Sequence, residues 1–209
     1  MTKTSLVSMP VSALLDAFAS SAPTPGGGSA AALSGAIGAS LLAMVAALPK
    51  TKTGEASERE ALDRAGAALN ELRKALADLI DEDTRAYDLV TAAYRSPKAT
   101  DEEKAARKTA IQAALRAATE APLATMRACA AAIREAAVIA QNGNANAASD
   151  VFVGVDMAHT GLRGAEKNVA INLGGLTDEQ FRSAVAAEAR QLLATAETRT
   201  AEIAAALAI

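Results

Sequence analysis

The stretch Ser21–Ala39 reads SAPTPGGGSAAALSGAIGA, and the fold expected for the rest of the chain follows from it. Its two prolines keep the approach extended, because proline fixes φ and pushes the preceding residue out of the helical region. Gly26, Gly27 and Gly28 leave their backbone N–H groups uncovered, and from Ser29 the alanine-rich composition favours a helix. The partly positive end of this helix would face the gap that the glycines leave.

Two interpretations of this stretch are open. Ala31, Gly35 and Ala39 are small residues four apart, and they would let a second helix approach closely. The stretch would then be a packing device. Alternatively, the uncovered N–H groups at the start of the helix would cradle part of a ligand.

The composition predicts helices almost everywhere. Alanine dominates the 209 residues, aromatic residues make up 2% of them and tryptophan is missing, so the helices can pack closely. A chain of this length can bury a sizeable core. We expect a single all-α domain, residues 1–209, with six or seven helices.

The charges argue against a nucleic-acid partner. The 21 basic and 24 acidic residues give a net charge of −3 and are mixed along the helices, without a basic stripe and interleaved aromatics. Cys129 is the only cysteine, which excludes an internal disulfide and suits a reducing cytoplasm. Since His159 is the only histidine, a metal site built from cysteine and histidine is also disfavoured.

The uncharged segment Ala22–Pro49 is long enough to raise the question of a membrane span. Its centre is alanine and glycine rather than leucine and isoleucine, so insertion into lipid would be only weakly favourable. A helix that is apolar all round is also what a soluble bundle buries at its centre. We therefore expect a central core helix and no membrane partner.

Capping signals divide the rest of the chain into helices. The first short helix would start at Ser8–Pro10, and the glycine-led helix would end near Leu48. Capping boxes, in which serine or threonine precedes glutamate or glutamine by three residues, would start three helices. These pairs are Ser57 with Glu60, Thr100 with Glu103, and Thr177 with Gln180. Pro122 would start a further helix, after one that ends near Thr119, and Gly143 would end it.

An acidic residue stands where the helical pattern demands an apolar one. Apolar residues recur at spacings of three and four at Leu62, Ala65, Leu69, Leu72, Leu76 and Leu79. The same spacing continues to Asp83, whereas Asp81 and Glu82 point elsewhere. Patterns tend to break at functional sites, although a helix near its end can also leave the core and expose such a residue. Asp83 is therefore a candidate functional carboxylate.

Short hydrogen-bonding side chains crowd the loop 142–150, which reads NGNANAASD. Loop and cap chemistry is one interpretation, with Ser149 or Asp150 as the N-cap of a helix over about 150–173. On that helix one face carries glycine, alanine and asparagine, which suggests a polar pocket wall with room beside it. The residues of this face are Gly161, Ala165, Asn168 and Asn172.

Four motifs together resemble the cyclodeaminase/cyclohydrolase family, whose members act on folate-bound one-carbon units. They are Pro25–Ser29, Asp81–Asp83 with Ala86 and Tyr87, the loop from Gly143 to Asp150, and Asn168 with Asn172. The resemblance runs in order from about Val11 to Leu176, and it looks closest to the branch of stand-alone methenyltetrahydrofolate cyclohydrolases. It implies a multihelical array around a central helical bundle, a homodimer, and no metal or cofactor beyond the tetrahydrofolate substrate.

The resemblance also implies a folate pocket, lined by Gly26, Gly27, Gly28, Ser29, Asp83, Asn144, Asn146 and Asp150. Asp83 would be the general base that takes a proton from the water attacking the methenyl carbon. Asp150 is the second catalytic candidate, either pairing with Asp83 or binding N–H groups of the pterin ring. Asn144 and Asn146 suit the pterin edge or the developing formyl oxygen. Asn168 would belong to the pocket wall, and the glycine turn with Lys52 would hold the anionic glutamate tail.

One segment departs from the family pattern. Many members carry a Gly-Lys-Lys-x-Tyr type segment after the glycine-led helix, whereas Pro49–Gly54 reads PKTKTG. Only Lys50 or Lys52 could supply its basic part, and both could equally be ordinary solvated lysines. The expected function is hydrolysis of 5,10-methenyltetrahydrofolate to 10-formyltetrahydrofolate. The alternatives are formiminotetrahydrofolate cyclodeamination, which releases ammonia, and a non-catalytic folate-binding helical dimer.

Overall fold

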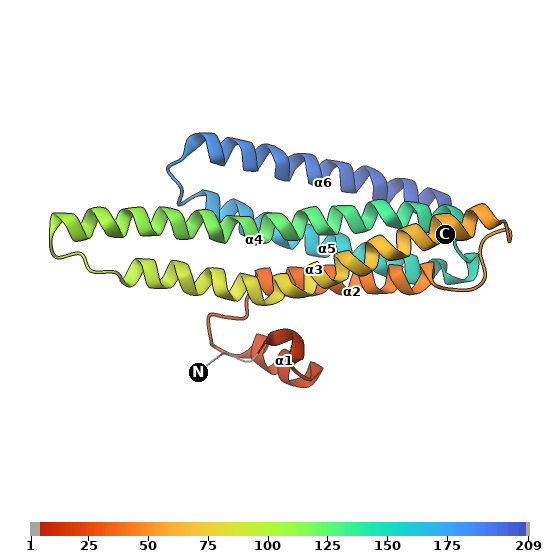
Figure 1. Ribbon diagram of the computed structural model, residues 1–209, viewed down its shortest axis with the longest axis horizontal. Coiled ribbons are helices and arrows are strands. Elements are labelled where there is room, and N and C mark those ends of the chain that lie inside the picture. The colour runs from red at the N-terminus through yellow and green to blue at the C-terminus, as the bar shows by residue number, and fades with distance from the viewer. Residues whose placement is uncertain (1–4, 208–209) are drawn as a thin grey trace.

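The computed structural model describes residues 5–207, and the regular elements in that range are all helical (Figure 1). The α-helices are α1 Val11–Ala19, α2 Gly27–Ala46, α3 Ala56–Arg95, α4 Asp101–Asn142, α5 Ala148–Leu173 and α6 Glu179–Leu207. Two 3-10 helices, η1 Leu6–Ser8 and η2 Ala145–Ala147, complete the set. The prediction of an all-α fold is confirmed.

The glycine-led helix α2 is the core helix that the uncharged segment predicts. It packs mainly against α5 and α3, while α6 covers the opposite side of the bundle, next to α4 (Figure 1). Within residues 5–207 it is the only helix long and apolar enough to cross a membrane, and 61% of its apolar window is buried inside the fold. A buried core helix has this composition too.

The small residues of α2 serve helix packing. A Cβ atom on Gly38 would lie 2.5 Å from the Gly154 carbonyl oxygen and 2.7 Å from the Ala158 nitrogen, both in the backbone of α5. Gly161 is equally close to α2, because a Cβ there would lie 2.6 Å from the Ala31 carbonyl oxygen. Gly35, one of the three small residues four apart, is closed in as well, because a Cβ atom there would lie 2.5 Å from Cys129 Sγ. The packing interpretation is therefore confirmed. The expectation of open room beside Gly161 is wrong, because the α2 backbone fills that space.

Replacing Gly38 by alanine should destabilise the protein by about 1–3 kcal/mol or more, since the new methyl group meets rigid backbone. The measurement is urea unfolding followed by circular dichroism. Gly66→Ala is the matched control, because its methyl group would meet a single side-chain atom, Ala46 Cβ, at 3.3 Å. A Gly38→Ala protein as stable as the control would contradict the close α2–α5 packing.

The expected helix break at Pro122 does not occur, and α4 runs unbroken from Asp101 to Asn142. A proline inside a helix leaves the carbonyl four residues earlier without its usual partner. That carbonyl belongs to Ala118, and the Asn172 side chain of α5 donates to it at 2.7 Å. The Asn172 side chain thus has a structural role in holding the α4 backbone, and not the pocket-wall role predicted for it. The two helices predicted on either side of Pro122 are one.

The predicted helix starts have mixed outcomes. The capping box of Thr100 with Glu103 is confirmed, with both of its bonds present. The box of Ser57 with Glu60 is wrong, because the N-cap of α3 is Glu55. At α6, Asp178 accepts from the Phe181 amide at 3.0 Å, whereas Thr177 donates to Gln112. The N-cap of α5 is Ala147, so Ser149 and Asp150 lie within its first turn.

The helix α1 lies apart from the main bundle, on the side of α2 and α3 (Figure 1). Leu6 and Leu14 form a separate apolar cluster with Ala32 of α2 and Ile80 of α3. The N-terminal segment is also held by Asp81, which accepts hydrogen bonds from the Leu6 amide at 2.7 Å and from the Ser5 hydroxyl. This attachment places α1 beside the start of α2, where the site described next is found.

Candidate active site

The Asp83 side chain faces the first turn of α2, as its seam position predicts. Its carboxylate accepts from the Ser29 amide at 2.9 Å. The Ser29 hydroxyl lies 3.0 Å from the same carboxylate and 2.9 Å from the Ile80 carbonyl oxygen, and its single proton serves one acceptor at a time. Ser29 is fully buried, whereas Asp83 is half-buried. A carboxylate is thus held at the edge of the core.

Gly28 leaves the space that this carboxylate occupies. A Cβ atom on Gly28 would lie 1.9 Å from Asp83 Oδ1, which is far inside van der Waals contact. Burial raises the pKa of Asp83, while its hydrogen bonds with Ser29 lower it, and burial has the larger effect. The arrangement produces a carboxyl group that is less acidic than an exposed one.

The start of α2 does not offer a free anion site within the described chain. Its partly positive end already faces the Asp83 carboxylate, so the glutamate tail expected at the glycine turn would compete with a protein anion. Gly26 is the N-cap, and Gly27 lies next to Asn168, whose Nδ2 would be 3.9 Å from a Cβ there. Asn168 itself donates to the Gly164 carbonyl oxygen of its own helix.

The other predicted site residues gather near the far end of α2. The Lys52 amide donates to the Asn142 carbonyl oxygen at 2.9 Å, and a β-bridge joins Thr51 to Gly143. Lys52 and Asn144 line one cavity of about 180 Å³. The Asn144 side chain accepts from the Asn146 amide at 3.1 Å. Asp150 follows in the first turn of α5.

The structure therefore divides the predicted site into two groups. The Asp83 group contains Gly26, Gly27, Gly28, Ser29, Asp83 and Asn168, and the Lys52 group contains Lys52, Asn144, Asn146 and Asp150. Asp150 and Asn168 are 18 residues apart on α5, which at 1.5 Å per residue separates the groups by about 27 Å. Within one chain, Asp150 and Asp83 do not pair.

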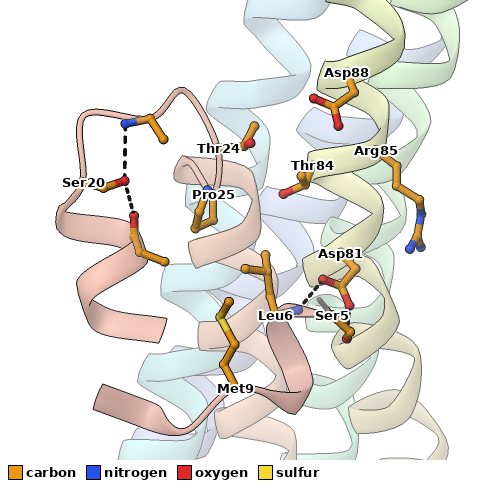
Figure 2. Close-up of a pocket in the computed structure, with 12 residues that line it drawn as sticks. Ser5, Leu6, Met9, Ser20, Thr24, Pro25, Asp81, Thr84, Arg85 and Asp88 are labelled. Atoms are coloured by element: carbon orange, nitrogen blue, oxygen red, sulfur yellow. Dashed lines mark hydrogen bonds between the residues drawn. The ribbon is translucent and has the colours of Figure 1, made fainter. Parts of the chain in front are cut away.

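A cavity of about 630 Å³ lies beside the Asp83 group, between the N-terminal segment and α3 (Figure 2). Thr84 and Pro25 line it and adjoin Asp83 and the glycine turn, but Asp83 itself faces α2 instead. Its charged lining residues are Asp81, Arg85 and Asp88. Sequence reasoning missed this cavity, because no local pattern shows that residues near position 5 reach α3.

Glu58 is a further feature that sequence reasoning missed. Its side chain fixes the loop that carries Lys52. Its carboxylate accepts from the Thr51 hydroxyl at 2.7 Å, the Thr53 amide at 2.9 Å and the Gly54 amide at 3.1 Å. These bonds lower the pKa of Glu58 to about 2. The loop between α2 and α3 is thus fixed through one carboxylate.

Glu58→Gln should loosen this loop and change the response to acid. Because the folded-state pKa of Glu58 is about 2, below its usual 4.5, its contribution to stability is complete above pH 4.5 and disappears as the pH falls toward 2. The variant should therefore lose part of the acid dependence of thermal unfolding in that interval. Glu60→Gln, an exposed change on the same helix, is the control. Identical acid profiles for wild type and Glu58→Gln would contradict the anchoring role.

The single cysteine and histidine do not join either group. Cys129 is buried, and burial raises the pKa of its thiol to about 12, as expected for a packing residue rather than a nucleophile. His159 lies within α5, and its buried Nε2 has no hydrogen-bond partner among residues 5–207. Among residues 5–207, no cluster of three or more histidine, cysteine, aspartate or glutamate side chains is arranged to hold a metal ion.

Residues 10–191 match the family model described as formiminotransferase-cyclodeaminase. The chain belongs to this family, as its motifs indicate.

Individual members of this family can be compared with the chain over most of its length. The chain is 45% identical over 190 residues to a methenyltetrahydrofolate cyclohydrolase from Methylorubrum extorquens, and the match covers 89% of each protein. It is 31% identical to the chicken (Gallus gallus) formimidoyltransferase-cyclodeaminase, covering 94% of this chain but only 36% of that protein. The crystal structure of a formiminotetrahydrofolate cyclodeaminase from Thermotoga maritima superposes with a TM-score of 0.85 at 29% identity, covering 96% of both chains.

Proposed function

We propose that the protein hydrolyses 5,10-methenyltetrahydrofolate to 10-formyltetrahydrofolate. The observation that carries the proposal is the half-buried Asp83 carboxylate, held by Ser29 in a chain with 45% identity to a cyclohydrolase. The substrate carbon between N5 and N10 has cationic amidinium character. A fixed carboxylate beside it stabilises the positive charge without having to reorganise.

In the proposed mechanism Asp83 acts as a general base. It takes a proton from a water molecule as the water oxygen bonds to the methenyl carbon. The hydroxyl group of the resulting carbinolamine loses its proton to solvent and becomes the formyl C=O as the carbon–nitrogen bond to N5 breaks. The protonated Asp83 returns its proton to N5, and the formyl group stays on N10. Ser29 holds the Asp83 carboxylate in place through its amide, and Gly28 leaves the space that this carboxylate needs.

The Lys52 group is proposed to bind the rest of the substrate. Lys52 is exposed on its fixed loop and can neutralise a carboxylate of the glutamate tail. Asn144 and Asn146 offer donors and acceptors to the polar edge of the pterin or to the formyl oxygen. Asp150, the second catalytic candidate, can accept from pterin N–H groups.

We further propose that the chain acts as one domain, residues 1–209, in a cytoplasmic homodimer. It would need no metal or cofactor beyond tetrahydrofolate, because water and a carboxylate suffice for the chemistry described. Neither nucleic acid nor a membrane is proposed as a partner. The mixed surface charge and the mostly buried α2 support the last two points.

The raised pKa of Asp83 predicts an acid limb in the pH profile. A general base must be ionised, so kcat/KM should fall as the pH drops through the Asp83 pKa, at a higher pH than an exposed aspartate with pKa 3.8 would give. The measurement is initial rate against pH at substrate concentrations below KM, corrected for the buffer-catalysed reaction. A flat profile down to pH 3.8 would contradict the assignment.

Cyclodeamination is the alternative that the relatives keep open, since the solved Thermotoga structure carries that name. It would use the same groups but expel ammonia from a formimino group. The test is one preparation assayed with both substrates, following methenyltetrahydrofolate consumption and ammonia release. Faster turnover of methenyltetrahydrofolate is expected, and turnover of formiminotetrahydrofolate alone would overturn the proposal.

A further inference from the structure

The two oxygens of the Asp83 carboxylate have different surroundings. The Ser29 amide and the Ser29 hydroxyl both face Oδ2, at 2.9 Å and 3.0 Å. Within residues 5–207, Oδ1 accepts no hydrogen bond, and it lies over Gly28, where a Cβ atom would be only 1.9 Å away. Oδ2 is therefore the anchored oxygen, whereas Oδ1 keeps its lone pairs for a proton from outside.

The Ser29 hydroxyl group has two acceptors at nearly the same distance. Asp83 Oδ2 lies 3.0 Å from Ser29 Oγ, and the Ile80 carbonyl oxygen lies 2.9 Å from it. Ile80 can accept this bond in addition to one inside α3, because a carbonyl oxygen has two lone pairs. Ser29 is fully buried, and Thr84 Oγ1 is farther away, at 3.5 Å. A rotation of the hydroxyl group therefore decides between Asp83 and Ile80.

The charge of Asp83 determines which acceptor is preferred. Hydrogen bonds to an ionised carboxylate are roughly twice as strong as those to a neutral oxygen. While Asp83 is ionised, the Ser29 hydroxyl should therefore donate to Oδ2. Once Asp83 is protonated, Oδ2 is a neutral carbonyl oxygen that already accepts from the Ser29 amide. The Ile80 carbonyl oxygen, which is slightly closer, then becomes the better acceptor.

We propose that the Ser29 hydroxyl changes its acceptor during turnover, donating to Asp83 Oδ2 while Asp83 is ionised and to the Ile80 carbonyl oxygen once Oδ1 has taken a proton. The inference rests on the proposed function and deepens it. In the hydrolysis step one O–H bond of water breaks, its proton goes to Oδ1, and the water oxygen bonds to the methenyl carbon. Ser29 keeps its own proton throughout and is a positioning residue. Its hydroxyl turns back when Oδ1 gives the proton to N5.

The groups packed around Asp83 leave Ser29 as its main polar neighbour. The helix α2 carries no charged residue, and the α5 side chain nearest the glycine turn is the neutral Asn168. Burial raises the pKa of Asp83 and the two bonds from Ser29 lower it. The charged groups on the side of the neighbouring cavity all belong to α3, and they are Asp81, Arg85 and Asp88. The ionisation of Asp83 should therefore respond directly to the Ser29 hydroxyl.

The first test is the pH profile of Ser29→Ala, which loses the hydroxyl but keeps the amide. Its acid limb in kcat/KM should move to higher pH by about one unit, because the ionised carboxylate loses a donor. Ser29→Cys, with a weaker S–H donor, should lie between this variant and wild type. Ser34→Ala is the matched control, since Ser34 is another α2 serine and donates to the Met157 carbonyl oxygen at 2.7 Å. An acid limb that stays in place in Ser29→Ala would overturn the proposal.

The second test follows the Ile80 carbonyl by NMR and needs no turnover. Ile80–Asp81 is the only Ile-Asp pair in the sequence, so protein labelled with carbonyl-¹³C isoleucine and ¹⁵N aspartate gives one signal for this carbonyl. As the pH falls through the titration of Asp83, the signal should move downfield, because the carbonyl gains the Ser29 hydroxyl as a donor. Ser29→Ala should lose this movement, and it corrects for the neighbouring Asp81 carboxyl, which it retains.

Asp83→Asn provides the matching neutral state. Its side chain carries no charge at any pH, so the Ile80 signal should stay at the low-pH position of wild type throughout. A wild-type signal that moves no more than that of Ser29→Ala would overturn the change of acceptor, whether or not the protein turns over folate. The expected movement in a protein without turnover would reject the hydrolase but keep the role of Ser29.

Discussion

Asp83→Asn should lower kcat for methenyltetrahydrofolate hydrolysis by about 100-fold or more, the usual contribution of a positioned general base. The amide keeps the size and can still accept from the Ser29 amide, but it cannot take a proton from water. The dissociation constant of the folate should change only a few fold. Turnover is measured by absorbance, and binding is measured by calorimetry with a tetrahydrofolate that does not react.

The same variant separates a functional carboxylate from a structural one. Because burial raises the pKa of Asp83, its ionised form costs stability at neutral pH, so Asp83→Asn should have an unchanged or higher melting temperature. Asp78→Asn, at an exposed position on the same helix, is the control. Full turnover by Asp83→Asn would remove Asp83 as the base. A large fall in melting temperature with binding lost would make its role structural.

Gly28→Ala should abolish most turnover as well, although the substitution adds only one methyl group. That methyl group would lie 1.9 Å from Asp83 Oδ1, so the carboxylate must leave its position against Ser29. Gly27→Ala is a closely matched control, because its nearest neighbour would be the Asn168 amide nitrogen at 3.9 Å. The measurement is kcat for the two variants side by side.

A Gly28→Ala protein that turns over substrate as fast as wild type would show that the Asp83 position against α2 is not needed for catalysis. A crystal structure of Gly28→Ala should show the Asp83 side chain rotated away from Ser29. Activity lost in Gly27→Ala but kept in Gly28→Ala would point to the Asn168 side of the helix instead.

Local patterns predicted most of the helices, because the spacing of apolar residues and the capping residues act within one segment of the chain. The apolar spacing that continues to Asp83 and the capping box that starts at Thr100 are two such patterns. The continuity of α4 could not be predicted, since it depends on Asn172, a residue 50 positions later, bonding to the carbonyl that Pro122 frees. Likewise, α3 begins after Glu55 rather than after Ser57, and the Glu58 carboxylate in its first turn bonds to the preceding loop.

The residues of the candidate site were named from the sequence, but their division into an Asp83 group and a Lys52 group was not predicted. Sequence places Asp83 on a core-facing seam, and the resemblance adds Lys52 and Asp150 to the same pocket. The sequence does predict nearly the full length of α2, to about Leu48. The resemblance, however, assigns the residues near both ends of this helix to one pocket, because a list of motifs contains no distances between its residues.

The most direct measurement is the loss of methenyltetrahydrofolate absorbance with purified protein, over the rate in buffer alone. Hydrolysis through Asp83 predicts a clear acceleration that is proportional to protein concentration and absent from Asp83→Asn. A wild-type rate no faster than buffer, from folded protein that binds the folate, would contradict the proposed function.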